Sequence, residues 1–215
     1  DRLRSRGLGD VYKRQYKLFE VSAVEPYLLN GEPVEFTVNE NNAENGVVTV
    51  KLKDTPVKGK ITIEKKGEML TGHATEETKY GTKYIPTYEV KGLEGVVYEV
   101  FAAENIGVPS TVYHKAGEKV CELTTQADGR ATSGLLYLGK YVIREKSTKS
   151  GFVLDTKEYE VELKYDDQHT AVVAETLTKE NIRQKALVQM EKQAEHYDPN
   201  TGAIYTAYGE GFTFG

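Results

Sequence analysis

The stretch YVIREKSTKSGFVLDTKEYEVELK, residues 141 to 164, decides the fold of this chain because it occurs in two versions. It aligns without a gap on YKLFEVSAVEPYLLNGEPVEFTVN, residues 16 to 39, at a shift of 141 − 16 = 125. Further along, the shift is 181 − 54 = 192 − 65 = 127. The chain is therefore a tandem repeat whose period has the size of one small domain. The matched pairs are Tyr16 and Tyr141, Glu20 and Glu145, Ser22 and Ser147, Leu29 and Leu154, Glu35 and Glu160, Asp54 and Asn181, and Lys65 and Lys192.

The repeat divides the chain into one complete unit flanked by parts of two others. Residues 57–184 form the complete unit, residues 16–56 the C-terminal part of a first unit, and residues 185–215 the opening of a third. Residues 1–15 carry five basic residues without apolar periodicity, so we expect a non-native, adapter-like segment there. GEGFTFG, residues 209–215, stops within an alternating apolar run, so we expect this chain to be a fragment of a longer one.

The complete unit consists of short runs of alternating apolar residues, separated by clusters of Gly, Asp and Asn. None of its segments shows a helical period of 3.6 residues over three turns. We therefore predict an all-β fold made of tandem, immunoglobulin-like β-sandwich domains. The predicted strands of the complete unit are 60–66, 84–91, 96–103, 118–125, 139–146, 157–164 and 170–180.

Composition excludes several classes of function. A net charge of −5 without a basic block argues against nucleic acid or an anionic membrane as a partner. The sequence contains no run of about 18 apolar residues, so we expect no direct insertion of this chain into a bilayer. Cys121 is the single cysteine, so no intrachain disulfide exists, and the four histidines lack the spacing of metal ligands. We find no nucleophile–base–orienter set and no phosphate loop, so we expect neither an enzyme with turnover nor a cofactor.

A lysine lies on a face that otherwise points into the core. Side chains alternate faces along a strand, so Ile61, Ile63 and Lys65 share one face, and the isoleucines mark it as buried. The same parity places Glu145 on the face of Ile143. Asn181 likewise shares the face of Leu177 in the last predicted strand.

The neighbouring copies repeat this arrangement. In the first copy, the apolar face of Val48, Val50 and Leu52 ends in Asp54. In the third copy, the face of Ala186, Val188 and Met190 ends in Lys192. The recurrence indicates that these polar residues share a chemical role and do not occur at the strand ends by chance.

Buried lysine, carboxyl and amide groups can form a covalent bond with one another. Burial disfavours the charged form of an amine, and a neutral amine is a nucleophile. A nearby carboxylic acid can polarise an amide carbon and move protons. Attack of Lys65 on Asn181 would release ammonia, whereas attack on Asp54 in the first copy would release water. The alternative is structural: Lys65 and Glu145 form an ion pair, or their charged ends reach towards solvent.

Four segments of the chain resemble a known domain family. The segments are KGKITIEKKGE (58–68), GLEGVVYEVFAAENI (92–106), TTQADGRATSGLLYLGKYVIREKSTKSGFVL (124–154) and ETLTKENIRQK (175–185). They resemble the collagen-adhesin B-type (CnaB) or SpaA-like pilin domain, a prealbumin-like β-sandwich of Gram-positive surface proteins. The resemblance extends over residues 16–215. It departs from the family at Ser147, Thr148 and Lys149, where an Ala-Pro pair is common, and we expect this departure to alter only a loop.

The resemblance implies roles for the polar residues. It implies Lys65 as nucleophile, Glu145 as catalytic acid and Asn181 as acceptor of an intramolecular isopeptide bond, formed once per molecule. It implies the corresponding roles for Glu20 and Asp54 in the first copy and for Lys192 in the third.

The resemblance also implies a place and a function for the protein. The implied function is a secreted, cell-wall-anchored stalk segment of a pilin or adhesin, whose partners are the neighbouring domains of the same chain. The alternative is an adhesin module that binds host extracellular matrix, glycan or other surface proteins through Tyr80, Tyr84, Tyr88 and Tyr113.

Overall fold

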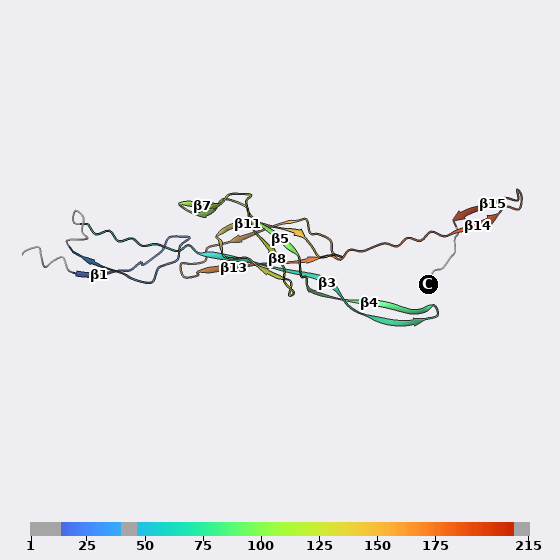
Figure 1. The fold of residues 1–215 in the computed structure, drawn as a ribbon, viewed down its shortest axis with the longest axis horizontal. Coiled ribbons are helices and arrows are strands. Elements are labelled where there is room, and N and C mark those ends of the chain that lie inside the picture. Colours follow the sequence, from blue (N-terminus) through green and yellow to red (C-terminus); the bar gives the residue numbers. More distant parts are fainter. Residues whose placement is uncertain (1–13, 40–46, 209–215) are drawn as a thin grey trace, which may run out of the picture.

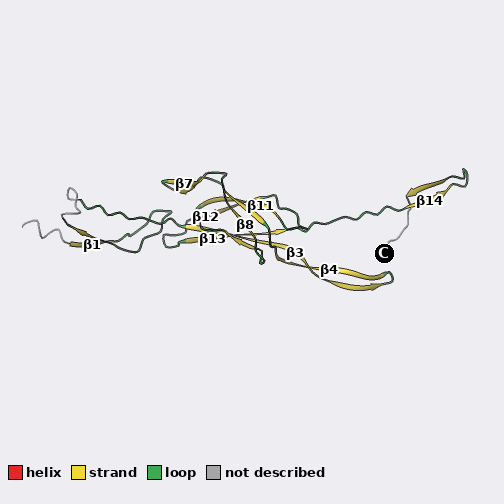
Figure 2. Ribbon diagram, in the orientation of Figure 1, coloured by secondary structure: helices red, strands yellow, loops and turns green. Residues whose placement is uncertain are grey.

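The computed structural model describes residues 14–39 and 47–208, and those residues form strands and loops without a helix (Figures 1 and 2). The predicted all-β class is confirmed. No helix in the described ranges could therefore cross a membrane. The strands are β1 (Arg14–Leu18), β2 (Val34–Val38), β3 (Lys58–Thr78), β4 (Gly81–Gly92), β5 (Val97–Ala102), β6 (Ile106–Val108), β7 (Thr111–His114), β8 (Lys119–Thr124), β9 (Arg130–Thr132), β10 (Leu136–Tyr137), β11 (Gly139–Ser147), β12 (Glu158–Leu163), β13 (Val172–Asn181), β14 (Gln193–Tyr197) and β15 (Ile204–Tyr208).

Two expectations concern the ends of the chain. Most of the segment expected to be non-native, residues 1–13, lies outside the described residues, and so does GEGFTFG. Strand β1 nevertheless begins at Arg14, so the expected boundary before Tyr16 falls two residues inside a strand.

Two sheets form the sandwich of the complete unit. In the first, β3 pairs with β13 in parallel and with β4, β9 and β10 in antiparallel fashion. The second has the order β12-β11-β5-β8 and is antiparallel throughout. Because parallel neighbours cannot be joined by a tight turn, the chain between β3 and β13 builds the rest of the sandwich.

The core lies between these two sheets. Ile61 and Ile63 of β3, with Val100 of β5 and Ile143 of β11, are fully buried members of one hydrophobic cluster. Burial of such a side chain stabilises the fold by about 1.5–3 kcal/mol. Cys121 is half-buried against the same cluster, and burial raises the pKa of its thiol. The alternation in the sequence therefore marks the faces that the two sheets turn towards each other.

The first copy and the complete unit share their strand register. Pairing of Arg14 with Val38 in β1–β2 corresponds, at a shift of 125, to pairing of Gly139 with Leu163 in β11–β12. The isolated bridge between Tyr27 and Pro56 likewise corresponds to that between Phe152 and Arg183, since 152 − 27 = 125 and 183 − 56 = 127. The shifts are those of the sequence alignment, so the repeat extends to main-chain hydrogen bonds.

The hairpin of β3 and β4 runs well beyond the sandwich (Figure 1). The alternation predicted a strand over 60–66, but β3 continues to Thr78 and pairs with β4 as far as Gly81. Apolar alternation ends where the core ends, whereas the main-chain hydrogen bonds of a hairpin continue in solvent. The short strands β6, β7, β9 and β10 were also not predicted.

Two glycines allow a turn to approach the middle of β3. Lys65 N–H donates to Gly129 O at 2.8 Å, and Leu93 N–H donates to Lys65 O at 2.8 Å. A Cβ on Gly129 would overlap the main-chain oxygen of Lys65, and one on Gly92 would overlap the main-chain oxygen of Asp128. Gly129 also has a φ of +79°, which disfavours a side chain. The backbone of Lys65 is therefore fixed by a contact that only glycine permits.

We expect Gly129→Ala to destabilise the fold by about 2 kcal/mol more than Gly95→Ala. Gly95 has a similar φ of +80° but open space around its Cβ position, so the difference between the variants measures the overlap with Lys65. Equilibrium denaturation in urea gives the two free energies of unfolding. Equal losses would contradict the close approach.

Candidate functional site

Strand β3 carries Lys65 into the core. The side chain of Lys65 is fully buried, and its Nζ lies 2.8 Å from Oε2 of Glu145. This approach lacks hydrogen-bond geometry, and no other acceptor among the described residues bonds Nζ. The ring centroid of Tyr98 lies 5.7 Å away. Lys65 is therefore a buried amine next to a carboxyl group, and its N–H groups have no hydrogen-bond acceptor among the described residues.

Strand β11 places Glu145 in the opposite sheet, paired with Tyr98 of β5. Its side chain is 1% exposed. Oε2 accepts a hydrogen bond from the Tyr98 hydroxyl at 3.2 Å, and Oε1 accepts one from Asn181 Nδ2 at 2.6 Å. The register of β11 shifts just after Glu145, where a bulge separates it from Ser147. One carboxyl group therefore contacts both the amine and the amide.

Asn181 is the last residue of β13 and is 2% exposed. Strands β3 and β13 run parallel, with Lys65 opposite Lys179 and Asn181 opposite Gly67. A Cβ on Gly67 would lie 2.6 Å from the ring of Phe152. The missing side chain of Gly67 thus leaves room for Phe152, which is itself buried.

Thr148 also contacts the site, contrary to expectation. Its Oγ1 accepts a hydrogen bond from Asn181 Nδ2 at 2.7 Å. The amide nitrogen is therefore held between two oxygens, from Glu145 and Thr148. The prediction that the departure at residues 147–149 alters only a loop is wrong, because the bulge after Glu145 turns Thr148 towards β13.

The Tyr98 hydroxyl and the main-chain N–H of Asp155 donate hydrogen bonds to the carboxyl of Glu145, and the Tyr159 hydroxyl donates one to Asp155. Burial, with the added effect of Glu145, strongly raises the pKa of Tyr98, so its hydroxyl remains a donor at neutral pH. Burial opposes ionisation of Asp155, but hydrogen bonds from the Tyr159 hydroxyl and Lys157 N–H and the charge of Lys65 lower its pKa overall. The hydrogen bond to Asp155, at 2.7 Å, raises the pKa of Tyr159 to about 12.

The incomplete copies hold their predicted residues differently. Glu20 is half-buried and accepts a hydrogen bond from Asn30 N–H at 2.7 Å. The equivalent bond in the complete unit runs from Asp155 N–H to Glu145 at 3.5 Å. Asp54 is half-buried, and within the described ranges it has no hydrogen bond or ion pair to Glu20; Lys192 is exposed. Among the described residues, the three predicted side chains therefore come together in the complete unit.

The four tyrosines of the alternative function do not form one surface. Tyr84 and Tyr88 lie on β4 and Tyr80 in its turn, and all three are exposed. Tyr113 lies on β7, at the other end of the sandwich (Figure 1), and stacks on Tyr137 at a centroid distance of 4.1 Å. Within the described part of the chain, no group of His, Cys, Asp and Glu residues is arranged to hold a metal ion.

The middle of the chain matches a known family model. Residues 87–178 match the SpaA prealbumin-like fold domain, which confirms the predicted resemblance and fold for this part of the chain. The matched range contains Glu145 but neither Lys65 nor Asn181, so the match leaves their roles as predictions. No curated protein sequence matches the chain.

Several solved structures are similar to this chain. They include the Bacillus anthracis TIE protein, with a TM-score of 0.48 and 16% identity over 91% of this chain. GBS52, the minor pilin of Streptococcus agalactiae, has a TM-score of 0.40 and 19% identity over 74%. The major pilin SpaA of Corynebacterium diphtheriae has a TM-score of 0.39 and 18% identity over 59%. The chain covers only 32%, 61% and 31% of these proteins, respectively.

Proposed function

We propose that this chain, whose middle part is a SpaA-type prealbumin-like domain, is a stalk segment of an extracellular, cell-wall-anchored pilin or adhesin of Gram-positive type. Its units follow one another with boundaries after residues 56 and 184. An amide bond between the side chains of Lys65 and Asn181 covalently crosslinks β3 to β13 in the complete unit. The observation that carries the proposal is the contact of one buried carboxyl, Glu145, with both side chains.

Glu145 is placed to move the protons that this bond requires. Oε2 takes a proton from Lys65 Nζ, and the neutral amine attacks Cγ of Asn181. The bond between Cγ and Nδ2 then breaks. The departing nitrogen keeps its own two hydrogens and receives a third that came from Lys65 by way of Glu145, so ammonia leaves. The Lys65 nitrogen then gives a second proton to the Glu145 carboxylate and keeps one hydrogen as the new amide N–H. Burial excludes water, which would otherwise compete for the same carbon.

The bond would shorten the path of a pulling force through the unit. Tension enters β3 near Lys58 and leaves β13 after Asn181, at opposite ends of two parallel neighbours. A Lys65–Asn181 bond carries that tension directly between the strands, so the residues between them bear none of it. With a single cysteine, this chain has no disulfide that could do the same.

Intact-mass measurement of the full chain tests the proposal. We expect a mass about 17 Da below that of the sequence, because one ammonia is lost. Peptide mapping should find Lys65 and Asn181 in one branched peptide, and Asn181→Ala should have its full calculated mass. A wild-type chain of unchanged mass would overturn the proposed bond.

We expect Thr148→Val to slow formation of the bond by roughly fivefold to tenfold. Valine keeps the shape of threonine but removes the hydroxyl that holds Asn181 Nδ2, and one such hydrogen bond contributes about 1 kcal/mol. Samples taken at intervals from cell-free synthesis show the crosslinked fraction by mass. Thr148→Ser keeps the hydroxyl and should mature at close to the wild-type rate. Equal rates for the valine and serine variants would remove Thr148 from the mechanism.

A further inference from the structure

Gln168 of the complete unit makes two hydrogen bonds to the first copy. Gln168, in the loop between β12 and β13, accepts a hydrogen bond from Leu29 N–H on its main-chain oxygen at 2.9 Å. Its side-chain Oε1 accepts another from Ala23 N–H at 3.0 Å. Gln168 therefore binds both ends of the loop formed by residues 23–29.

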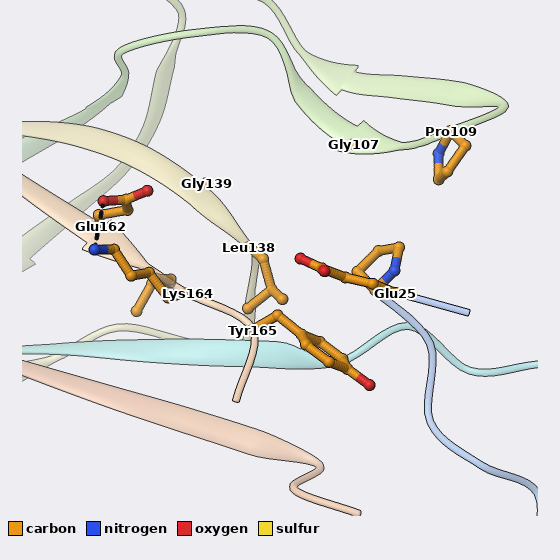
Figure 3. A pocket seen from close by; sticks show the side chains of 10 residues that line it. Glu25, Gly107, Pro109, Leu138, Gly139, Glu162, Lys164 and Tyr165 are labelled. Carbon is orange, nitrogen blue, oxygen red and sulfur yellow. Dashed lines mark ion pairs between the residues drawn. The ribbon is translucent and has the colours of Figure 1, made fainter. Parts of the chain in front are cut away.

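The two copies also enclose a cleft of about 690 Å3 (Figure 3). Glu25 and Pro26 of the first copy line it together with Leu138 and Tyr165 of the complete unit. Figure 3 shows Glu25 next to Leu138 and Tyr165. This junction is thus a defined contact between folded parts, beyond the covalent linker.

The complete unit has the same loop at its other end. Residues 148–154 are equivalent to residues 23–29 at the shift of 125. In the first copy, Leu28 N–H donates to Thr55 O, and in the complete unit Val153 N–H donates to Ile182 O, both at 2.9 Å. The two loops are therefore held against their linkers by equivalent hydrogen bonds.

Among the described residues, loop 148–154 lacks the hydrogen bond from another copy that its equivalent makes. Leu29 N–H has its acceptor in Gln168, whereas Leu154 N–H has no acceptor among the residues that the structure describes. Val153 and Leu154 are 49% and 39% exposed, while Leu28 and Leu29 are half-buried at the occupied junction.

We infer that loop 148–154 is the docking site of a further unit of this same repeat, bound through the segment equivalent to Tyr165–Gln168. The tether has the right length, because Asn181 precedes Lys185 by four residues, as Asp54 precedes Lys58. A unit that begins at residue 185 is therefore held as close to this loop as the complete unit is to loop 23–29. Successive junctions would repeat one fixed geometry and give a stiff stalk.

This inference rests on the proposed tandem arrangement but not on the Lys65–Asn181 bond. An extended chain, in which residues 1–184 are followed by a second copy of residues 58–215, tests it. The join preserves the repeat because residue 58 has the same position in its unit as residue 185 has in the next. Amide hydrogen exchange of Leu154 is then compared between this extended chain and the original one. We expect exchange at Leu154 to slow at least tenfold in the extended chain. Gln168→Gly in the added unit, which removes one of the two acceptors, should reverse part of that protection.

The original chain supplies the control. Leu29 N–H is already bonded to Gln168 and should exchange slowly there. Unchanged exchange of Leu154 in the extended chain, with Leu29 protected, would overturn the inference. Intact mass of the same samples reports the Lys65–Asn181 bond separately, so failure of the crosslink and failure of the junction are distinguishable.

Discussion

We expect Glu145→Gln to leave the chain uncrosslinked, with its full calculated mass and a markedly lower thermal midpoint. Glutamine fills the same space but cannot accept a proton from Lys65, so the amine is not activated to attack Asn181. The proposed Lys65–Asn181 bond would close a loop of 181 − 65 = 116 residues, which would contribute roughly 4–5 kcal/mol in the chain-entropy model. The expected fall in the midpoint is on the order of 10–20 °C.

Calorimetry and intact mass of the same samples measure both effects of Glu145→Gln. Glu175→Gln, on the exposed part of β13, is the matched control and should change neither mass nor midpoint appreciably. A Glu145→Gln chain that still loses ammonia would show that another group moves the proton. A wild-type midpoint in an uncrosslinked variant would show that the bond does not stabilise the fold.

Cutting the β3–β4 hairpin should leave the two halves of the protein covalently joined. The turn at Lys79 and Tyr80 is exposed and lies in the sequence between Lys65 and Asn181, so a protease site inserted there is accessible and separates the bonded residues. After cleavage, boiling and reduction, the chain should migrate on a denaturing gel as one branched species.

Variants without the bond show the opposite result. Asn181→Ala and Glu145→Gln, cut at the same inserted site, should separate completely into two fragments. Because the gel is run after denaturation, non-covalent contact between β3 and β13 cannot hold the halves together. Two fragments from the wild-type chain would contradict the bond irrespective of any stability measurement.

Much of the fold was predictable from the sequence because strand alternation has a strict period of two. The seven predicted strands of the complete unit all correspond to observed ones. The same periodicity placed Lys65, Glu145 and Asn181 on buried faces, and their side chains are 2% exposed or less. The repeat shifts of 125 and 127 recur as equivalent main-chain pairs. Each of these predictions rests on the alternation of neighbouring residues within one strand or on comparison with a second copy of the same segment.

Elements without an apolar signal could not be predicted. The outer part of β3 beyond Leu70 is exposed on both faces, so the apolar pattern ends although the hydrogen bonds to β4 continue. The contact of Thr148 with Asn181 was missed because a bulge changes the direction of side chains after Glu145. The grouping of the tyrosines failed because distance along the chain says little about position around a sandwich.

The sequence by itself determined that this protein is a tandem β-sandwich whose core faces carry a lysine, a glutamate and an asparagine, because alternation and repetition are properties of the chain. Only the tertiary structure decided that Glu145, from the opposite sheet, lies between Lys65 and Asn181 and contacts both. The reason is that parity assigns a residue to a face, whereas which residues meet across that face depends on how the two sheets pack.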